Sequence, residues 1–129
     1  MSDGQAKKPA PRRGAFVLDK QLARAAMDRR KVTFMVNLGS NYEVPGYIVG
    51  MDDYIVMVCV PSYDRYTGDG IGTTVTFVHK GSAAVTKISP DQTLDDESEL
   101  VRTRVTAIGS KFWAELAAPR ISSGQETSG

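Results

Sequence analysis

The segment from Gly46 to Val58 constrains the fold more than any other part of the chain. It reads Gly-Tyr-Ile-Val-Gly-Met-Asp-Asp-Tyr-Ile-Val-Met-Val, two apolar runs separated by an acidic pair. Gly46 allows the backbone to bend sharply where a side chain would clash. The pair Asp52-Asp53 is typical of a tight turn. The segment therefore predicts a strongly bent antiparallel pair, of the kind that curls a short sheet into a small barrel.

Apolar residues recur with two different periods on either side of residue 31. Between residues 17 and 30 they are spaced three and four apart among Lys and Arg, which predicts one amphipathic helix. From residue 32 the period becomes two, so Val32, Phe34, Val36 and Leu38 are predicted to share one face of a strand. Five strands are expected between about residues 32 and 88, at 32–38, 42–50, 54–60, 73–78 and 83–88.

The segments outside these elements are predicted to be loops or tails. Residues 1–15 are basic and rich in Pro, which predicts a disordered arm, and residues 61–72 are expected to form a long loop. Tyr63 and Tyr66 of this loop, with Arg65, form either an additional stacking surface or a loop that packs on its own aromatic rings.

Beyond Pro90 the composition becomes acidic. Residues 91–129 are predicted to form an acidic linker, a possible short helix and a disordered tail. Arg102 and Arg104 favour a solvated helix, and the apolar side chains of residues 108–117, Phe112 and Trp113 among them, could dock a protein partner.

Charge is unevenly distributed along the 129 residues, which fit one domain with a net charge of only +1. Residues 1–31 contain nine Lys or Arg and three Asp, whereas residues 91–129 contain four basic and seven acidic residues. Such polarity suggests contact with a polyanion at one end of the chain and an acidic tail at the other.

Two stretches resemble the sequence motifs of the Sm-like superfamily. Residues 32–58 resemble the first motif, with Gly46 and Asp52 at its glycine and aspartate positions, and residues 77–85 resemble the second. In particular, the chain is similar to the Hfq family of bacterial RNA chaperones, whose second motif reads Tyr-Lys-His where this chain has Val78-His79-Lys80. The resemblance covers residues 17–90.

The resemblance implies a mainly β fold that assembles. An N-terminal α-helix would precede a strongly bent five-stranded antiparallel Sm-like barrel, and the subunits would form a homo-oligomeric ring, a hexamer in Hfq. Pairing of the fourth and fifth strands of successive subunits would remove the unpaired sheet edges. We expect residues 54–60 and 73–78 at this interface.

The resemblance also implies a pore face that binds single-stranded, uridine-rich RNA. Tyr54 would stack on a base, and His79 with Lys80 would contact base and phosphate. Two residues depart from the Hfq pattern, because Asp53 and Lys20 both replace base-contacting glutamines. Asp53 argues against uridine specificity, and Lys20 would favour phosphate.

Two further RNA-binding surfaces follow from the same resemblance. Arg24, Arg29, Arg30 and Lys31 form a basic cluster that corresponds to the rim of the Hfq ring, although a solvated helix face would have the same composition. On the opposite face Asn37 and Tyr42 would form a weaker second site, against which Glu43 argues.

Catalysis is not expected. The chain has one His, one Cys predicted to be buried, and none of the motifs of hydrolases, P-loop proteins or zinc proteases. Asp52-Asp53 would make a poor metal cage, so we expect no metal and no cofactor. No apolar run approaches the roughly 20 residues of a membrane span. A cytoplasmic protein without membrane contact is the expectation.

Two functions remain open from the sequence. The first is an RNA chaperone or post-transcriptional regulator that works as an Hfq-like ring. The second is a protein–protein assembly or regulatory module built on the same fold, without RNA binding.

Overall fold

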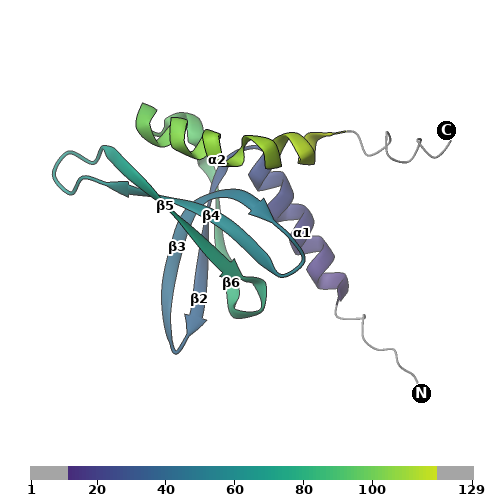
Figure 1. Cartoon of the computed structure of the whole chain (residues 1–129). Coiled ribbons are helices and arrows are strands. Elements are labelled where there is room, and N and C mark those ends of the chain that lie inside the picture. The colour runs from purple at the N-terminus through teal and green to yellow at the C-terminus, as the bar shows by residue number, and fades with distance from the viewer. Residues whose placement is uncertain (1–11, 119–129) are drawn as a thin grey trace, which may run out of the picture.

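The computed structural model describes residues 12–118, and side chains from residue 19 onward. The elements are α1 (Arg12–Met27), β2 (Arg30–Leu38), β3 (Ser40–Met51), β4 (Ile55–Tyr63), β5 (Gly70–His79), η1 (Lys80–Ser82), β6 (Ala83–Thr93), η2 (Leu94–Asp96) and α2 (Glu99–Ala117). The prediction of an N-terminal helix followed by five antiparallel strands is confirmed, and a second long helix follows them (Figure 1). Of the predicted arm, residues 1–11 lie outside the described residues. Residues 12–15 are helical instead, because α1 begins at Arg12.

The sheet has the order β5-β4-β3-β2-β6, and β3 bends in its middle. The first half of β3, through Gly46, pairs with β2, and its second half, from Tyr47, pairs with β4. A Cβ on Gly46 would lie 2.4 Å from the backbone oxygen of Cys59 and 2.8 Å from Val58 Cγ1. The close approach of two backbones therefore requires glycine here, as the sequence predicts.

The apolar core is formed by the bent sheet together with the two helices that pack on it. Val32, Phe34 and Val36 are buried as their alternation predicts, and α1 buries Leu22 and its neighbouring alanines against them. The prediction for the fourth residue of this face is wrong, because Leu38 is 64% exposed at the end of β2. It lies at the β2–β3 turn, beyond the reach of the helices.

Helix α2 belongs to the same core, which corrects the prediction of a solvated element. Val101, Val105, Gly109 and Trp113 are buried at a spacing of four residues, so they form one apolar stripe. The indole Nε1 of Trp113 donates a hydrogen bond to the backbone oxygen of Ile48 at 2.9 Å. The helix packs on β3 and β5.

The partner-binding segment predicted at residues 108–117 is therefore mostly used within the chain. Trp113 is 3% exposed, and Phe112 and Leu116 pack against the same core. Ile108 remains 38% exposed on the outer side of the helix. Apolar side chains on one stripe of a helix bury equally well against a partner or against their own sheet, so the sequence alone did not distinguish the two.

Several predicted boundaries change. The helix ends at Met27 instead of residue 30, since Arg29 adopts a left-handed conformation with φ of 52°. The predicted loop of residues 61–72 shrinks to a turn of residues 64–69, because β4 continues to Tyr63 and β5 begins at Gly70. The carboxylate of Asp64 caps this turn by accepting the backbone N–H groups of Tyr66 and Thr67. The linker predicted from residue 91 begins instead as the end of β6.

The edges of the sheet are β5 and β6, which corrects part of the predicted interface. Residues 54–60 fall mainly on β4, which is paired with β3 on one side and β5 on the other. Its backbone groups are therefore occupied within the chain, and it cannot add a strand from a neighbour. Residues 73–78 lie on the edge strand β5.

Candidate nucleic-acid interface

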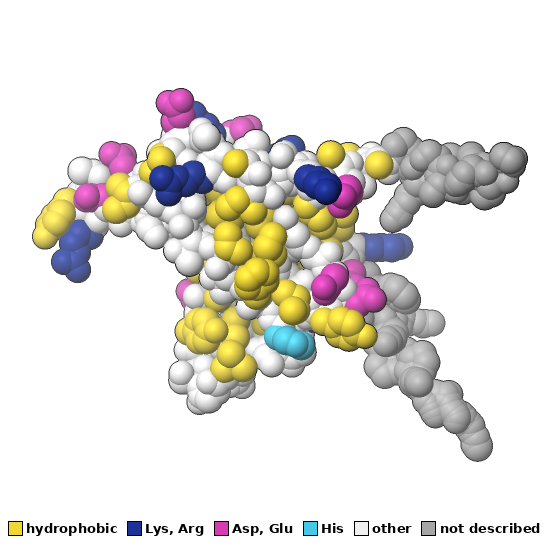
Figure 2. Space-filling view, viewed as in Figure 1, with side chains coloured by type: hydrophobic (Ala, Val, Ile, Leu, Met, Phe, Trp, Pro, Cys, Tyr) yellow, Lys and Arg dark blue, Asp and Glu magenta, His cyan; other side chains and the backbone are white. Residues whose placement is uncertain are grey.

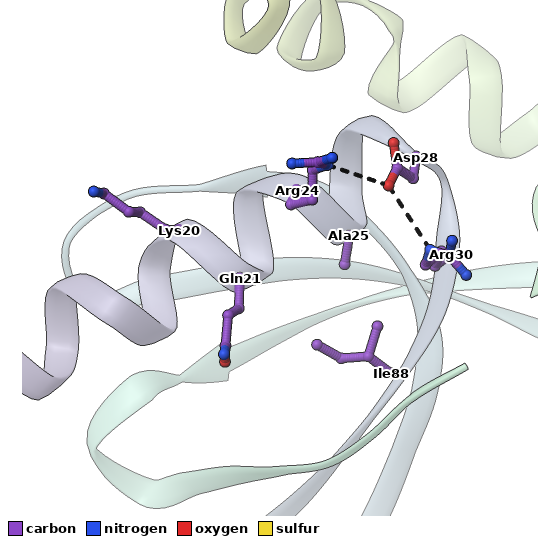
Figure 3. Close-up of a pocket in the computed structure, with 7 residues that line it drawn as sticks. All are labelled: Lys20, Gln21, Arg24, Ala25, Asp28, Arg30 and Ile88. Carbon is purple, nitrogen blue, oxygen red and sulfur yellow. Dashed lines mark ion pairs between the residues drawn. The ribbon is translucent and has the colours of Figure 1, made fainter. Parts of the chain in front are cut away.

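An open groove lies between α1 and β6, with a volume of about 450 Å³. Its cationic side chains come from α1 and from the first residue of β2, and Ile88 of β6 forms part of its wall (Figure 3). Among the side chains that the structure describes, the lining is Lys20, Gln21, Arg24, Ala25, Asp28, Arg30 and Ile88. Three cations and one carboxylate line the groove, so it attracts anions.

Helix periodicity explains why these residues lie together. Leu22 and Ala25 are buried against the sheet, so Lys20, Arg24 and Asp28, four residues apart, follow one exposed edge of the helix. Asp28 Oδ2 lies 3.5 Å from Arg24 Nε and 3.8 Å from Arg30 Nε. Because these pairs are solvent-exposed and long, they orient the arginines without removing their affinity for another anion.

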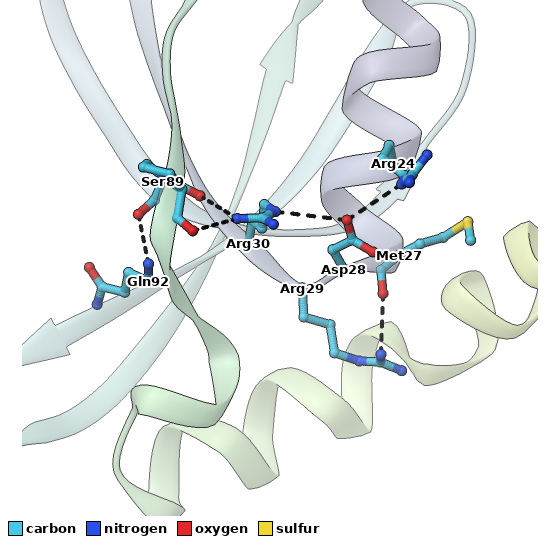
Figure 4. A network of polar contacts seen from close by, with 8 residues as sticks. Arg24, Met27, Asp28, Arg29, Arg30, Ser89 and Gln92 are labelled. Carbon is cyan, nitrogen blue, oxygen red and sulfur yellow. Dashed lines mark hydrogen bonds and ion pairs between the residues drawn. The ribbon is translucent and has the colours of Figure 1, made fainter.

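Arg30 is also held from the opposite side. Its Nη1 donates hydrogen bonds to the backbone oxygens of Ser89 at 3.1 Å and Pro90 at 2.7 Å (Figure 4). Ser89 in turn accepts from the backbone N–H of Gln92 through its hydroxyl. The guanidinium of Arg30 is therefore fixed at one end of the groove.

A second cluster surrounds the β3–β4 turn. The Asp52 carboxylate accepts the backbone N–H groups of Tyr54 at 2.7 Å and Ile55 at 2.8 Å, and these bonds, Ile55 first, hold the pKa of Asp52 below its ordinary value. The turn projects Tyr54, which is 69% exposed, into solvent. Asp53 is exposed beside it.

The end of β5 meets this turn. The backbone oxygen of Tyr54 accepts a hydrogen bond from the backbone N–H of Lys80 at 2.8 Å, and His79 pairs with Ile55 in the sheet. The one histidine of the chain lies exposed on this face, near apolar and acidic side chains (Figure 2). The structure thus brings together Tyr54, Asp53, His79 and Lys80, as the sequence predicts for the pore face.

Lys80 is not a free cation. Its Nζ lies 3.0 Å from Asp19 Oδ1 on α1, and its side chain is 17% exposed. This ion pair ties η1, at the end of β5, to α1. Lys20, predicted for the same pore-face set, follows Asp19 in the chain but lines the α1–β6 groove with Arg24.

The four residues of the predicted rim do not form a single cluster. Arg24 and Arg30 line the groove, whereas Arg29 stacks on the ring of Trp113, with its Cζ 4.4 Å from the ring centroid. Lys31 lies on the strand, where its Nζ contacts the hydroxyl of Tyr63 at 3.0 Å. Arg29 is left-handed and β2 begins at Arg30, so consecutive side chains here point in different directions. The sequence predicted a helix to residue 30, from whose end these side chains would have projected together.

The weaker site predicted on the opposite face lies at the β2–β3 hairpin. Asn37 is exposed there, and Tyr42, paired with Val36, is 46% exposed. Glu43 is exposed next to it. The hairpin therefore offers one aromatic face beside a carboxylate.

A buried carboxylate was not predicted at all. Glu97 is 6% exposed and accepts hydrogen bonds from the hydroxyls of Tyr47 at 2.5 Å and Tyr63 at 2.9 Å, and from Gln92 Nε2 at 3.2 Å. Burial raises the pKa of Tyr47 and of Tyr63, and the bond to Glu97 raises both further. Both tyrosines are therefore neutral donors.

This network changes the interpretation of Tyr63. Its hydroxyl bridges Lys31 and Glu97, and Lys31 Nζ lies 5.0 Å from the centroid of its ring, whereas Tyr66 is 86% exposed with Arg65 nearby. Glu97 sits in a run of acidic residues with no apolar pattern. No signal in the sequence marked it as buried.

Comparison with protein-family models, with curated proteins and with solved structures found no match. None of the helices within residues 12–118 has the length and apolar character needed to span a bilayer. In the same part of the chain, His, Cys, Asp and Glu do not gather in groups of three or more that could hold a metal ion.

Proposed function

We propose that the chain is a subunit of an Hfq-like Sm ring that binds single-stranded RNA, as an RNA chaperone or post-transcriptional regulator in the cytoplasm. The observation that carries the proposal is the open α1–β6 groove, which is lined by Lys20, Arg24 and Arg30, with Asp28 as the one carboxylate among its described side chains. An extended groove with this charge suits a sugar–phosphate backbone.

The β3–β4 turn supports base contact next to this groove. Tyr54 offers an exposed aromatic face, and stacking on such a face contributes about 1–3 kcal/mol per base with little sequence preference. Asp19, which pairs with Lys80 beside this turn, and Lys20, which lines the groove, are neighbours on α1.

Assembly into a ring would repeat these contacts. The edge strands β5 and β6 each have one unpaired side within the described chain, so β5 of one subunit can pair with β6 of the next. Phe77 and Ile71 on β5 are 66% and 57% exposed, and burial between subunits would remove them from water. Several copies of a modest site multiply the affinity for one RNA strand.

The same exposed apolar residues favour a second candidate function. Met57 and Phe77 line a small apolar groove beside Asp52, with a volume of about 260 Å³. A protein–protein assembly module without RNA binding would use this surface and would leave the α1–β6 groove empty.

A binding titration separates the two functions. Oligo-uridine and oligo-adenine of equal length are titrated into the protein at about 50 mM and about 200 mM salt, over which range phosphate contacts lose affinity steeply. We expect salt-sensitive binding that weakens in Lys20→Ala, Arg24→Ala and Tyr54→Ala. Arg104→Ala, which removes an exposed cation on α2, serves as the matched control.

The proposal fails if neither oligonucleotide binds, or if the groove and Tyr54 variants bind as the control does. The native mass, measured by light scattering, tests the ring separately. A monomeric mass would exclude the ring but would not exclude RNA binding in the groove.

A further inference from the structure

The ammonium group of Lys80 is neutralised by a carboxylate from a distant part of the chain. Its Nζ lies 3.0 Å from Asp19 Oδ1, and the two residues are 61 positions apart. The pair is partly buried, with 17% of the Lys80 side chain and 35% of the Asp19 side chain exposed. It is therefore screened by salt less than a fully exposed pair, and it still borders solvent.

Lys80 belongs to the β3–β4 turn through its backbone. Its N–H donates a hydrogen bond to the backbone oxygen of Tyr54 at 2.8 Å, directly after β5 ends at His79. From this fixed backbone the flexible lysine stem carries the ammonium to α1. The exposed ring of Tyr54 and the paired ammonium of Lys80 therefore belong to residues that are bonded to each other.

The charges around the turn leave no surplus of positive charge for an RNA phosphate. Asp52 and Asp53 lie on the turn, and Asp19 reaches Lys80 from α1. Lys80 and His79 contribute to the lowered pKa of Asp52, after the larger effect of its two backbone hydrogen bonds. Among these described side chains, with His79 counted as neutral at pH 7, three carboxylates stand against one ammonium.

Two consecutive residues of α1 act on RNA in opposite ways. Lys20 lines the α1–β6 groove, whereas Asp19 pairs with Lys80. Neighbouring side chains of a helix point about 100° apart, so one turn of α1 presents a cation to the groove and a carboxylate to η1. The groove keeps its cations available, and the β3–β4 turn does not.

We propose that Asp19 competes with RNA phosphate for Lys80, as an autoinhibitory contact built into α1. A carboxylate and a phosphate accept the same charge-assisted hydrogen bonds from an ammonium group. At 17% exposure the paired Lys80 offers little surface to a second anion, so a phosphate binds it only when Asp19 releases it. The inference rests on the proposed function, because it assigns a regulation to the same RNA-binding surface.

The test is a double-mutant cycle of Asp19→Asn and Lys80→Met, read by titrating oligo-uridine into the full chain at several salt concentrations. Asp19→Asn should tighten binding about twofold to fivefold, as expected when one such ion pair no longer has to be broken. It should also steepen the salt slope by about 0.7, the increment for one phosphate of a single strand. In the Lys80→Met background the slope should not steepen, because the ammonium is absent. Asp95→Asn, which removes one exposed carboxylate on η2, is the matched control for net charge.

The wild-type chain gives a second readout that does not depend on how the variants fold. In the ¹³C-labelled protein, the side-chain carboxyl signal of Asp19 and the Cε signal of Lys80 should both shift as oligo-uridine is added. The shifts are expected because each group exchanges its partner. Unchanged signals at saturating RNA would overturn the inference.

The outcomes separate this inference from the proposed function. If oligo-uridine binds but Asp19→Asn has the same effect in both Lys80 backgrounds, or no more effect than Asp95→Asn, the competition is refuted and RNA binding stands. If neither the wild type nor Asp19→Asn binds oligo-uridine, the proposed function and the inference both fail. Binding by Asp19→Asn alone supports the competition and refutes RNA binding by the unmodified chain.

Discussion

Gly109→Ala should stabilise the protein if α2 is a solvated helix and destabilise it if α2 packs on the sheet. In a solvated helix the substitution stabilises by about 0.8–1 kcal/mol, because alanine loses less backbone freedom on folding. In the structure a Cβ at this position would lie 2.7 Å from Trp113 Cζ2 and 2.9 Å from Val49 Cγ1. Both atoms belong to buried side chains, and the indole is held by its bond to Ile48.

The balance of the two terms gives the expected magnitude. Inserting a methyl group into a packed site costs about 1–3 kcal/mol, and the gain in helix propensity offsets about 0.8–1 kcal/mol of that cost, so the expected net loss is between about 0 and 2 kcal/mol. For a domain of this size each kcal/mol lowers Tm by about 4 °C. The free energy of unfolding is measured by urea titration followed by circular dichroism, with the thermal midpoint as a second readout.

Ser110→Ala is the matched control for Gly109→Ala. Ser110 is the exposed neighbour on the same helix, and its replacement should stabilise by roughly 0.5 kcal/mol through helix propensity alone. If Gly109→Ala stabilises the protein as Ser110→Ala does, α2 is not packed on the sheet. The solvated helix expected from the sequence would then be the better description.

Three further predictions concern the sheet and the polar network. Gly46→Ala should lower the free energy of unfolding by at least about 2 kcal/mol in a urea titration, because the backbone oxygen of Cys59 cannot move aside as a side chain does. An unchanged urea midpoint would contradict this prediction. Tyr47→Phe should lower it by about 1–3 kcal/mol, because Glu97 loses a buried donor. The pKa of Tyr47 is raised on folding. Its contribution to the free energy of unfolding is therefore complete below the ordinary tyrosine pKa near 10.0 and is lost as the pH rises further. Unfolding free energy measured above that pH should thus fall by up to about 1.4 kcal/mol per pH unit from this group, and Tyr47→Phe should fall less steeply. The pKa of Asp52 is lowered on folding, so the stabilisation of the turn by this carboxylate is present above pH 3.8, the ordinary pKa of Asp. It is lost as the pH falls through the lowered pKa of the folded protein. The amide signal of Tyr54 should therefore titrate with a midpoint below pH 3.8. A midpoint at or above that value would mean that the turn is not capped by this carboxylate.

Much of the sheet could be predicted because its signals are local. The alternation of Val32, Phe34 and Val36 is a property of neighbouring residues, and so is the turn chemistry of Asp52. The resemblance to the Hfq family predicted the cluster of Tyr54, His79 and Lys80, and the structure brings these residues together because β4 begins where β5 ends.

Contacts between distant residues were beyond the reach of such signals. Glu97 is buried only because Tyr47 and Tyr63, from two different strands, donate to it. An acidic stretch carries no periodicity that would reveal such partners. Lys80 likewise finds its ion pair with Asp19, 61 residues earlier in the chain.

By itself the sequence determined which segments pair as strands and where glycine must stand, because backbone sterics and apolar alternation act over a few residues. Only the tertiary structure decided that α2 covers the sheet, that β4 is interior, and that Arg29 stacks on Trp113 whereas Arg30 lines the α1–β6 groove. Each of these depends on which surface an apolar stripe or a charged side chain meets, and that choice is made between elements far apart along the chain.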